Sequence, residues 1–140
     1  MKKILVLFML LMTITANCFA SSINQEFENT NIEQVKQGIV KAISIFSAKT
    51  NLVEKDDNTI VLFNIVDTVD KNNKFMYRDK KDIICELVQK GNNVEMTLSS
   101  KYERIYADGT NEVEEYDNVK ELKAVLNSVK RVFLIVTFME

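Results

Sequence analysis

The sequence predicts an α+β fold, with an N-terminal helix, an antiparallel meander of about four strands and a C-terminal helix. Near both ends of the mature region, apolar residues recur every three or four positions, which is typical of amphipathic helices. Between these regions, short runs of β-forming residues are separated by polar turns, as in antiparallel strands. A sheet with helices packed on one side accommodates this order most simply.

Residues 1–20 have the features of an export signal. Two lysines form a basic start, a mainly apolar segment follows, and small residues precede a cleavage site after Ala20. The apolar segment covers about 13 residues, fewer than the roughly 20 that a membrane-anchoring helix needs. Cys18 offers lipid modification as an alternative, but the preceding Asn17 departs from the lipobox pattern. We therefore expect a periplasmic or secreted protein without a lipid anchor at Cys18 or a membrane span in its mature chain.

Composition limits the partners of the mature chain. Two of the 18 basic residues lie in the signal and all 20 acidic ones follow it, which leaves a formal charge of −4. This charge argues against nucleic acid or anionic lipid as the main partner. Cys85 is the one cysteine beyond the signal, so no intramolecular disulfide can form. The absence of Asn-x-Ser/Thr sequences, together with the basic start, favours a bacterial source.

Residues 21–29 are polar and unpatterned, and we expect a flexible leader there, followed by a single domain over 30–140. A helix is expected next, because apolar residues fall at intervals of three and four: Ile32, Val35, Ile39, Ala42 and Phe46. Thr30 and Glu33 have the spacing of a capping box. Gly38 costs roughly 1 kcal/mol relative to Ala within a helix, which favours a close approach of helix to sheet there.

A first hairpin is expected from residues 51–55 and 59–66, separated by a polar turn. The second of these runs is apolar on both faces, which indicates a central strand covered on both sides. Residues 67–74 are polar and are interpreted as a connection.

For a second hairpin, the sequence predicts the pairing register as well as the two strands. Two alternating apolar sets flank Gly91 and Asn92: Ile83, Cys85 and Leu87, then Val94, Met96 and Leu98. A tight turn centred on Gly91 and Asn92 places Leu87 opposite Met96, and Cys85 opposite Leu98, so both sets share one face. The second strand should end at Asp108–Gly109.

Residues 111–117 are strongly acidic and are interpreted as a loop, although Val113 and Tyr116 would permit a short strand. Helical spacing then returns: Val119, Leu122, Leu126, Val129, Phe133 and Val136. Residues 132–139 are rich in β-forming residues, so a terminal strand remains an alternative to the end of this helix.

Few catalytic chemistries are open to this chain, and we predict no catalytic residue, no cofactor and no metal. The lack of His removes the commonest general base and metal ligand. The three glycines are too far apart for a phosphate-binding loop. Acidic residues cluster at positions 112, 114, 115 and 117, where a solvated loop is favoured over weak calcium binding, because the spacing is not that of an EF-hand. Cys85 is predicted to pack in the core.

Five residues are candidates for contact with a partner: Tyr77, Arg78, Tyr102, Arg104 and Tyr106. Tyr and Arg are enriched at binding hot spots, because they combine a large contact area with directed hydrogen-bond donors. The alternative is a sheet face on which the tyrosines cover the core and Arg104 is solvated.

Three functions follow from these observations. The first is a non-catalytic module that binds an unknown protein or envelope component through a sheet face or edge. The second is a small enzyme that uses carboxylates or tyrosines in a concave sheet, and the third is an oligomeric envelope subunit that packs through residues 132–139. The element order resembles that of cystatin-like folds and periplasmic inhibitor-like modules, in architecture alone, so it implies no site residues.

Overall fold

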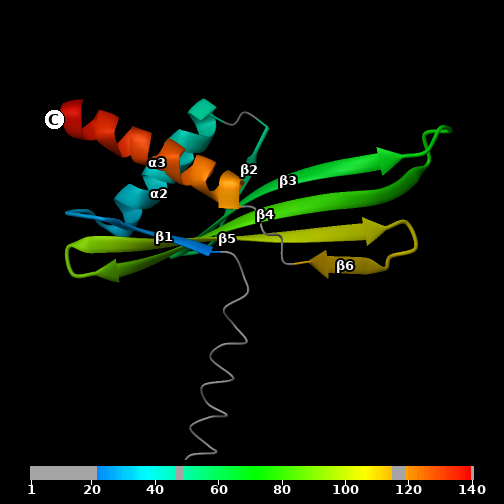
Figure 1. The fold of residues 1–140 in the computed structure, drawn as a ribbon, viewed down its shortest axis with the longest axis horizontal. Coiled ribbons are helices and arrows are strands. Elements are labelled where there is room, and N and C mark those ends of the chain that lie inside the picture. Colours follow the sequence, from blue (N-terminus) through cyan, green and yellow to red (C-terminus); the bar gives the residue numbers. More distant parts are fainter. Residues whose placement is uncertain (1–21, 47–48, 115–118, 140) are drawn as a thin grey trace, which may run out of the picture.

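The computed structural model describes residues 22–46, 49–114 and 119–139. The predicted signal with Cys18, and the acidic residues 115 and 117, lie outside this part of the chain. The described residues form a six-stranded antiparallel sheet in the order β1-β5-β4-β3-β2, with β6 also paired to β5. Two helices lie on one face of this sheet (Figure 1). The elements are β1 Ser22–Phe27, α2 Ile32–Phe46, β2 Asn51–Asp56, β3 Thr59–Val69, β4 Phe75–Lys90, β5 Asn93–Tyr106, β6 Asn111–Glu114 and α3 Val119–Met139.

The α+β prediction is confirmed, but about four strands is too few, because β1 and β6 lie in segments predicted to be irregular. The predicted leader is wrong over Ser22–Phe27, which pairs with β5 from Ser99 back to Val94. Phe27 is buried, and its ring centroid lies 4.8 Å from that of Phe133. Strand β1 forms because the edge of β5 is available for pairing. The mostly polar sequence of β1 does not by itself predict a strand. The folded domain therefore includes residues before position 30.

Helix α2 begins at Ile32 as predicted, but its capping box is shifted by one residue. The Asn31 side chain accepts a hydrogen bond from the Gln34 backbone N–H at 2.9 Å, and the Gln34 side chain accepts one from the Asn31 N–H at 3.2 Å. The prediction of Thr30 and Glu33 as the box is wrong. Thr30 instead donates its hydroxyl to Gln34 Oε1 at 2.9 Å. The reciprocal pair fixes the start of the helix.

Gly38 permits a close approach, but to α3 and not to the sheet as predicted. A Cβ atom at this position would lie 2.5 Å from Cε2 of Phe133. The ring of Phe133 thus occupies the space that any other residue at position 38 would need. Since Phe133 also contacts Phe27, Gly38 sets the distance between α2 and α3 at the point where α3 meets β1.

The β4–β5 hairpin has the predicted register, with Leu87 opposite Met96 and Cys85 opposite Leu98. Gly91 has a φ of 60°, a conformation that favours glycine. The β2–β3 hairpin is also confirmed, but β3 extends into the predicted connection as far as Val69, which shortens the connection to residues 70–74.

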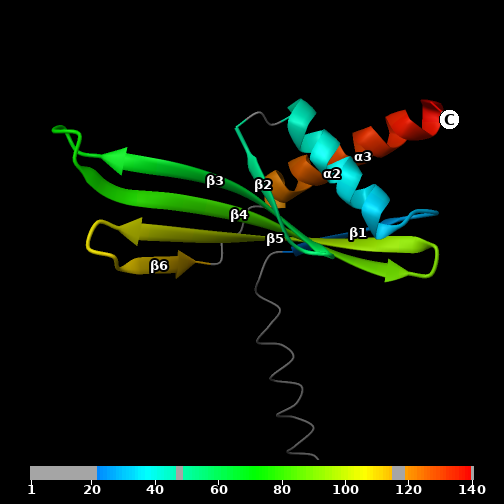
Figure 2. The ribbon, with the colours of Figure 1, turned by 180° about the vertical axis from the view of Figure 1, so that it is seen from behind.

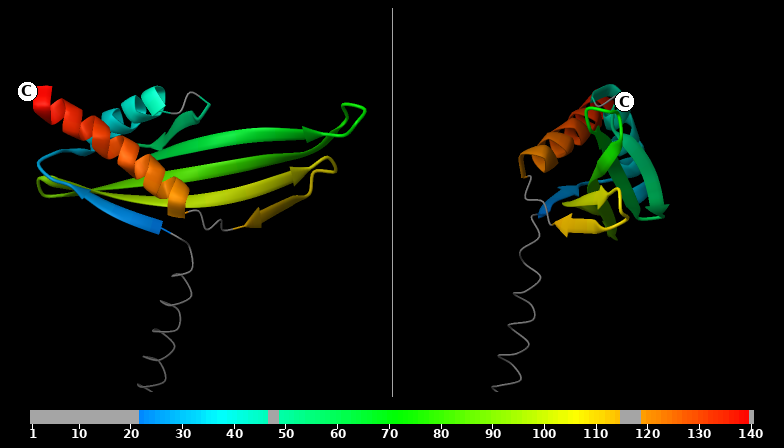
Figure 3. Two further views of the ribbon diagram at one scale, coloured as in Figure 1. Left: turned by 45° about the horizontal axis from the view of Figure 1, so that its top comes forward. Right: turned by 90° about the vertical axis from the view of Figure 1, so that its right-hand side faces the viewer.

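Strand β3 is covered on one face and not on both as predicted. Ile60 and Leu62 point toward the helices and are buried, whereas Ile65, on the other face, is 40% exposed. In the described part of the chain both helices lie on the same side of the sheet, so neither helix covers the alternate positions (Figure 3). The apolar character of both faces reflects β-propensity more than burial.

The C-terminal segment is a helix to Met139, so the alternative of a terminal strand is wrong. Leu122, Val129 and Val132 are buried against α2 and the sheet, and this packing outweighs the β-propensity of the last residues. Leu134 and Ile135 face outward, at 59% and 55% exposed. Among the described residues, neither helix has the length and apolar character needed to cross a bilayer.

The helices cover only part of the sheet. Figures 1 and 2 show β3, β4 and β5 continuing well beyond the ends of α2 and α3, with β6 beside the extended part of β5. Strand β1 pairs with the beginning of β5, and β6 pairs with its end. The sheet therefore has a covered half, which holds the core, and an extended half whose helix-side face neither α2 nor α3 covers.

Gly38→Ala should destabilise the fold by about 1–3 kcal/mol, the usual cost of overpacking, despite the better helix propensity of Ala. Chemical denaturation of the purified domain measures this difference. Phe133→Leu in the same chain should recover part of the loss, and Gln37→Ala, at an exposed position of the same helix, should change stability little. Equal stability of Gly38→Ala and the wild type would contradict the proposed packing constraint.

Candidate functional site

The extended half of the sheet brings four of the five predicted contact residues together. Tyr77 of β4 pairs with Tyr106 of β5, and Tyr102 and Arg104 occupy alternate positions of the same strand. Since side chains alternate along a strand, these positions share the face that carries Cys85 and Leu98 in the covered half. We call Tyr77, Asp79, Tyr102, Arg104 and Tyr106 the Tyr/Arg face. It lies on the helix side of the sheet, beyond the helices.

An ion pair lies at the centre of this face. Arg104 donates two hydrogen bonds to Asp79, at 2.7 and 3.1 Å, and the Tyr102 hydroxyl donates a third to the same carboxylate at 2.7 Å. The bonds from Arg104 lower the pKa of Asp79 more than its partial burial raises it. The bond to Asp79 also raises the pKa of Tyr102, so its hydroxyl keeps its proton at neutral pH. The geometry is that of a bidentate charge-assisted pair.

Aromatic rings surround this pair. The guanidinium carbon of Arg104 lies 4.1 Å from the ring centroid of Tyr77 and 6.0 Å from that of Tyr102, within the range of cation–π contacts. The rings of Tyr77 and Tyr106 meet edge to face, with centroids 6.3 Å apart. The Tyr106 hydroxyl donates to Glu112 of β6 at 3.0 Å, and this bond raises the pKa of Tyr106. These contacts hold the side chains of the face in defined positions.

Arg78 does not join the other four candidates. It lies on the opposite face of the sheet, because it is one residue away from Tyr77 along β4. There it donates two hydrogen bonds to Asp67 of β3, at 2.6 and 2.8 Å. The sequence-based grouping of Tyr77 with Arg78 is therefore wrong in space, although each residue is placed as strand alternation requires.

Sequence reasoning missed two members of the site. Asp79 stands opposite Arg104 in the register that the Gly91–Asn92 turn imposes, so extension of that register would have found it. No register predicted from the sequence brings Glu112 to this site. It lies in a segment interpreted as a loop, and only the pairing of β6 with β5 brings it to Tyr106.

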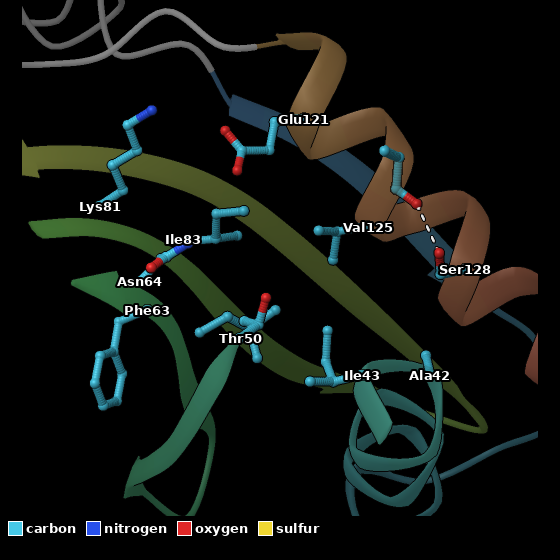
Figure 4. A pocket seen from close by; sticks show the side chains of 12 residues that line it. Ala42, Ile43, Thr50, Phe63, Asn64, Lys81, Ile83, Glu121, Val125 and Ser128 are labelled. Atoms are coloured by element: carbon cyan, nitrogen blue, oxygen red, sulfur yellow. Dashed lines mark hydrogen bonds between the residues drawn. The ribbon is translucent and has the colours of Figure 1, made fainter. Parts of the chain in front are cut away.

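A pocket of about 210 Å³ opens where the helices leave the sheet (Figure 4). Its lining comes from α2, β3, β4, α3 and Thr50, and consists of Ala42, Ile43, Thr50, Leu62, Phe63, Asn64, Lys81, Ile83, Glu121, Ala124, Val125 and Ser128. Figure 4 shows Lys81 and Glu121 at the same end of this space, with Ile43 and Val125 at the other. Among the described residues of the lining, one carries a carboxylate, whereas hydrolysis by a carboxylate pair requires two.

Cys85 is fully buried, so the prediction that it packs in the core is confirmed. Burial raises the pKa of its thiol to about 12, which leaves almost no thiolate at neutral pH. Within residues 22–46, 49–114 and 119–139, no three acidic, His or Cys side chains are grouped closely enough to hold a metal ion.

The ion pair predicts a specific pH dependence. Because the pKa of Asp79 is lowered in the fold, its carboxylate stabilises the protein above its unfolded pKa of about 3.9, and this stabilisation is lost as the pH falls through the lower folded pKa. The difference in unfolding free energy between wild type and Asp79→Asn should therefore shrink from pH 5 to pH 2, measured by denaturant titration. In the Arg104→Gln background this pH dependence should largely disappear. A difference that grows with acidity would show that the pKa is raised instead.

Comparison with known proteins gives little further information. No family model and no curated protein matches the chain. A solved structure, that of a DUF4468 family protein from Bacteroides ovatus, is similar with a TM-score of 0.34 and 13% sequence identity, over 84% of this chain and 82% of that one. A likeness of this degree identifies no family and gives no residue a role.

Proposed function

We propose that this chain is a non-catalytic module that binds a protein or envelope component through the Tyr/Arg face. The observation that supports the proposal most is the ordered cluster of three tyrosines and an Asp–Arg pair, on a part of the sheet that neither α2 nor α3 covers. All five side chains of the face are partly exposed, so a partner could contact their rings and remaining polar edges.

The energetics of such a face favour recognition of a folded partner. Contacts made by Tyr and Arg dominate many interfaces, because these side chains bury much area for few rotatable bonds. Here the rotamers are already restrained by mutual hydrogen bonds and ring contacts, which lowers the entropy lost on binding. The ion pair also neutralises the positive charge of Arg104, so the cluster offers no strong attraction to a polyanion.

The test is capture from an envelope extract by the immobilised mature chain. Tyr77→Ser, Tyr106→Ser and Arg104→Ala should each weaken capture of the partner at least about tenfold, the effect of losing a hot-spot contact. Arg78→Ala is the matched control, since it breaks an equivalent bidentate pair on the opposite face. Circular dichroism establishes that each variant is folded.

Equal capture by all variants would contradict a role for the Tyr/Arg face. Turnover of a substrate by the intact chain would favour the enzyme alternative instead. The exposed Leu134 and Ile135 favour a second candidate, an oligomeric subunit that packs through the end of α3. In that case the immobilised chain should capture further copies of itself, and Leu134→Lys should weaken this capture.

We also propose that the protein is exported and that its signal is removed after Ala20, which supports a periplasmic or secreted location. The basic start, the short apolar segment and the small residues before the site favour this processing. Intact-mass measurement of the protein expressed from its full sequence should therefore give a chain that begins at Ser21. A lipid-modified N-terminus at Cys18, or an uncleaved chain, would contradict the proposal.

A further inference from the structure

The pocket and the Tyr/Arg face form one continuous surface. Along the helix side of the sheet, Lys81 lies opposite Asn64 on β3 and opposite Tyr102 on β5. Lys81 and Asn64 line the pocket, and Tyr102 belongs to the Tyr/Arg face. A chain segment lying along the face would therefore pass beside Lys81, at the edge that the pocket shares with the face.

The walls of the pocket are mainly apolar. Leu62 and Ile83 contribute from the sheet, Ala42 and Ile43 from α2, and Val125 from α3. Ile43 and Ile83 keep 8% and 9% of their surface exposed although they belong to the core. The polar members of the lining, Thr50, Asn64, Lys81, Glu121 and Ser128, include both charge signs. The pocket is therefore suited to an apolar side chain that is attached to a polar, uncharged backbone such as a peptide.

The volume of the pocket limits the size of the apolar group that it can bind. A cavity of about 150 Å³ can hold a benzene molecule, whereas sites for drug-sized ligands or cofactors occupy roughly 300–1,000 Å³. At about 210 Å³, this pocket is large enough for one aromatic ring with its linking carbon, and it lies below the volume typical of sites for drug-sized ligands.

We propose that the pocket is the anchor site for one aromatic side chain, of the size of phenylalanine, carried by the protein that the Tyr/Arg face binds. This inference rests on the proposed function. Interfaces are commonly anchored by an aromatic side chain in a desolvated pocket beside a polar rim.

Two serines provide a matched pair of variants. Ser128 of α3 lines the pocket and donates its hydroxyl to the Ala124 carbonyl of its own helix at 3.0 Å. Ser44 of α2 makes the same kind of bond, to the Lys41 carbonyl at 2.8 Å, but is exposed and does not line the pocket. Ser128→Leu should fill the pocket, and Ser44→Leu should add the same side chain elsewhere.

The experiment has two readouts. In methyl-labelled protein, N-acetyl-phenylalanine amide should shift the methyl signals of Ile43, Ile83 and Val125, whereas N-acetyl-glutamine amide should not. Ser128→Leu should weaken both this binding and capture of the partner at least about tenfold, and Ser44→Leu should change neither. Ala124→Leu, also in the lining, serves as a second filling variant if Ser128→Leu unfolds at a lower temperature.

Absence of the methyl shifts in the wild type at millimolar probe would overturn the inference. So would full capture of the partner by Ser128→Leu, because a pocket that binds a free ring but not the partner is not an anchor site. These failures are separable from failure of the proposed function, which depends on the Tyr77, Arg104 and Tyr106 variants.

Discussion

The register of the β4–β5 hairpin is the constraint on which the rest of this structure depends. A two-residue turn, with Gly91 at a φ of 60°, begins a ladder that runs without a shift from Lys90–Asn93 to Tyr77–Tyr106. Near the turn this register places Leu87 and Met96 together in the core. Farther along it places Asp79 against Arg104. A slip by one residue would turn the core side chains and the Tyr/Arg face to the other side of the sheet.

The position of the helices decides which part of that ladder becomes core and which part stays open. Helices α2 and α3 approach closely at Gly38, where Phe133 fills the space of a missing side chain and reaches Phe27 on β1. This three-way contact holds both helices over the half of the sheet that β1 also edges. The remaining half is left with polar and aromatic residues, which satisfy one another through the Asp79–Arg104 pair and the tyrosine hydroxyls.

The pairing and partial burial of the Tyr/Arg face leave it poorly suited to acid–base catalysis, in keeping with the proposed role in recognition. The carboxylate of Asp79 accepts three hydrogen bonds and its pKa is lowered, so it is a poor general base. The thiol of Cys85 is buried and its pKa is raised to about 12, so it is a poor nucleophile. What the extended half offers is a set of oriented rings and donors next to an apolar pocket.

Local sequence patterns were sufficient for the features whose cause lies within a few residues. Helical spacing predicted α2 and the start of α3, and the Gly91–Asn92 turn predicted a register that holds as far as Tyr106. The other features depend on contacts between distant segments. Strands β1 and β6 exist because β5 offers its edge to them, and Glu112 reaches Tyr106 through that pairing. The separation of Arg78 from Tyr77 follows from strand alternation. Which of the two faces is left uncovered as a candidate site depends on where the helices end. Such contacts join residues that are far apart in the chain, so a local sequence pattern cannot predict them.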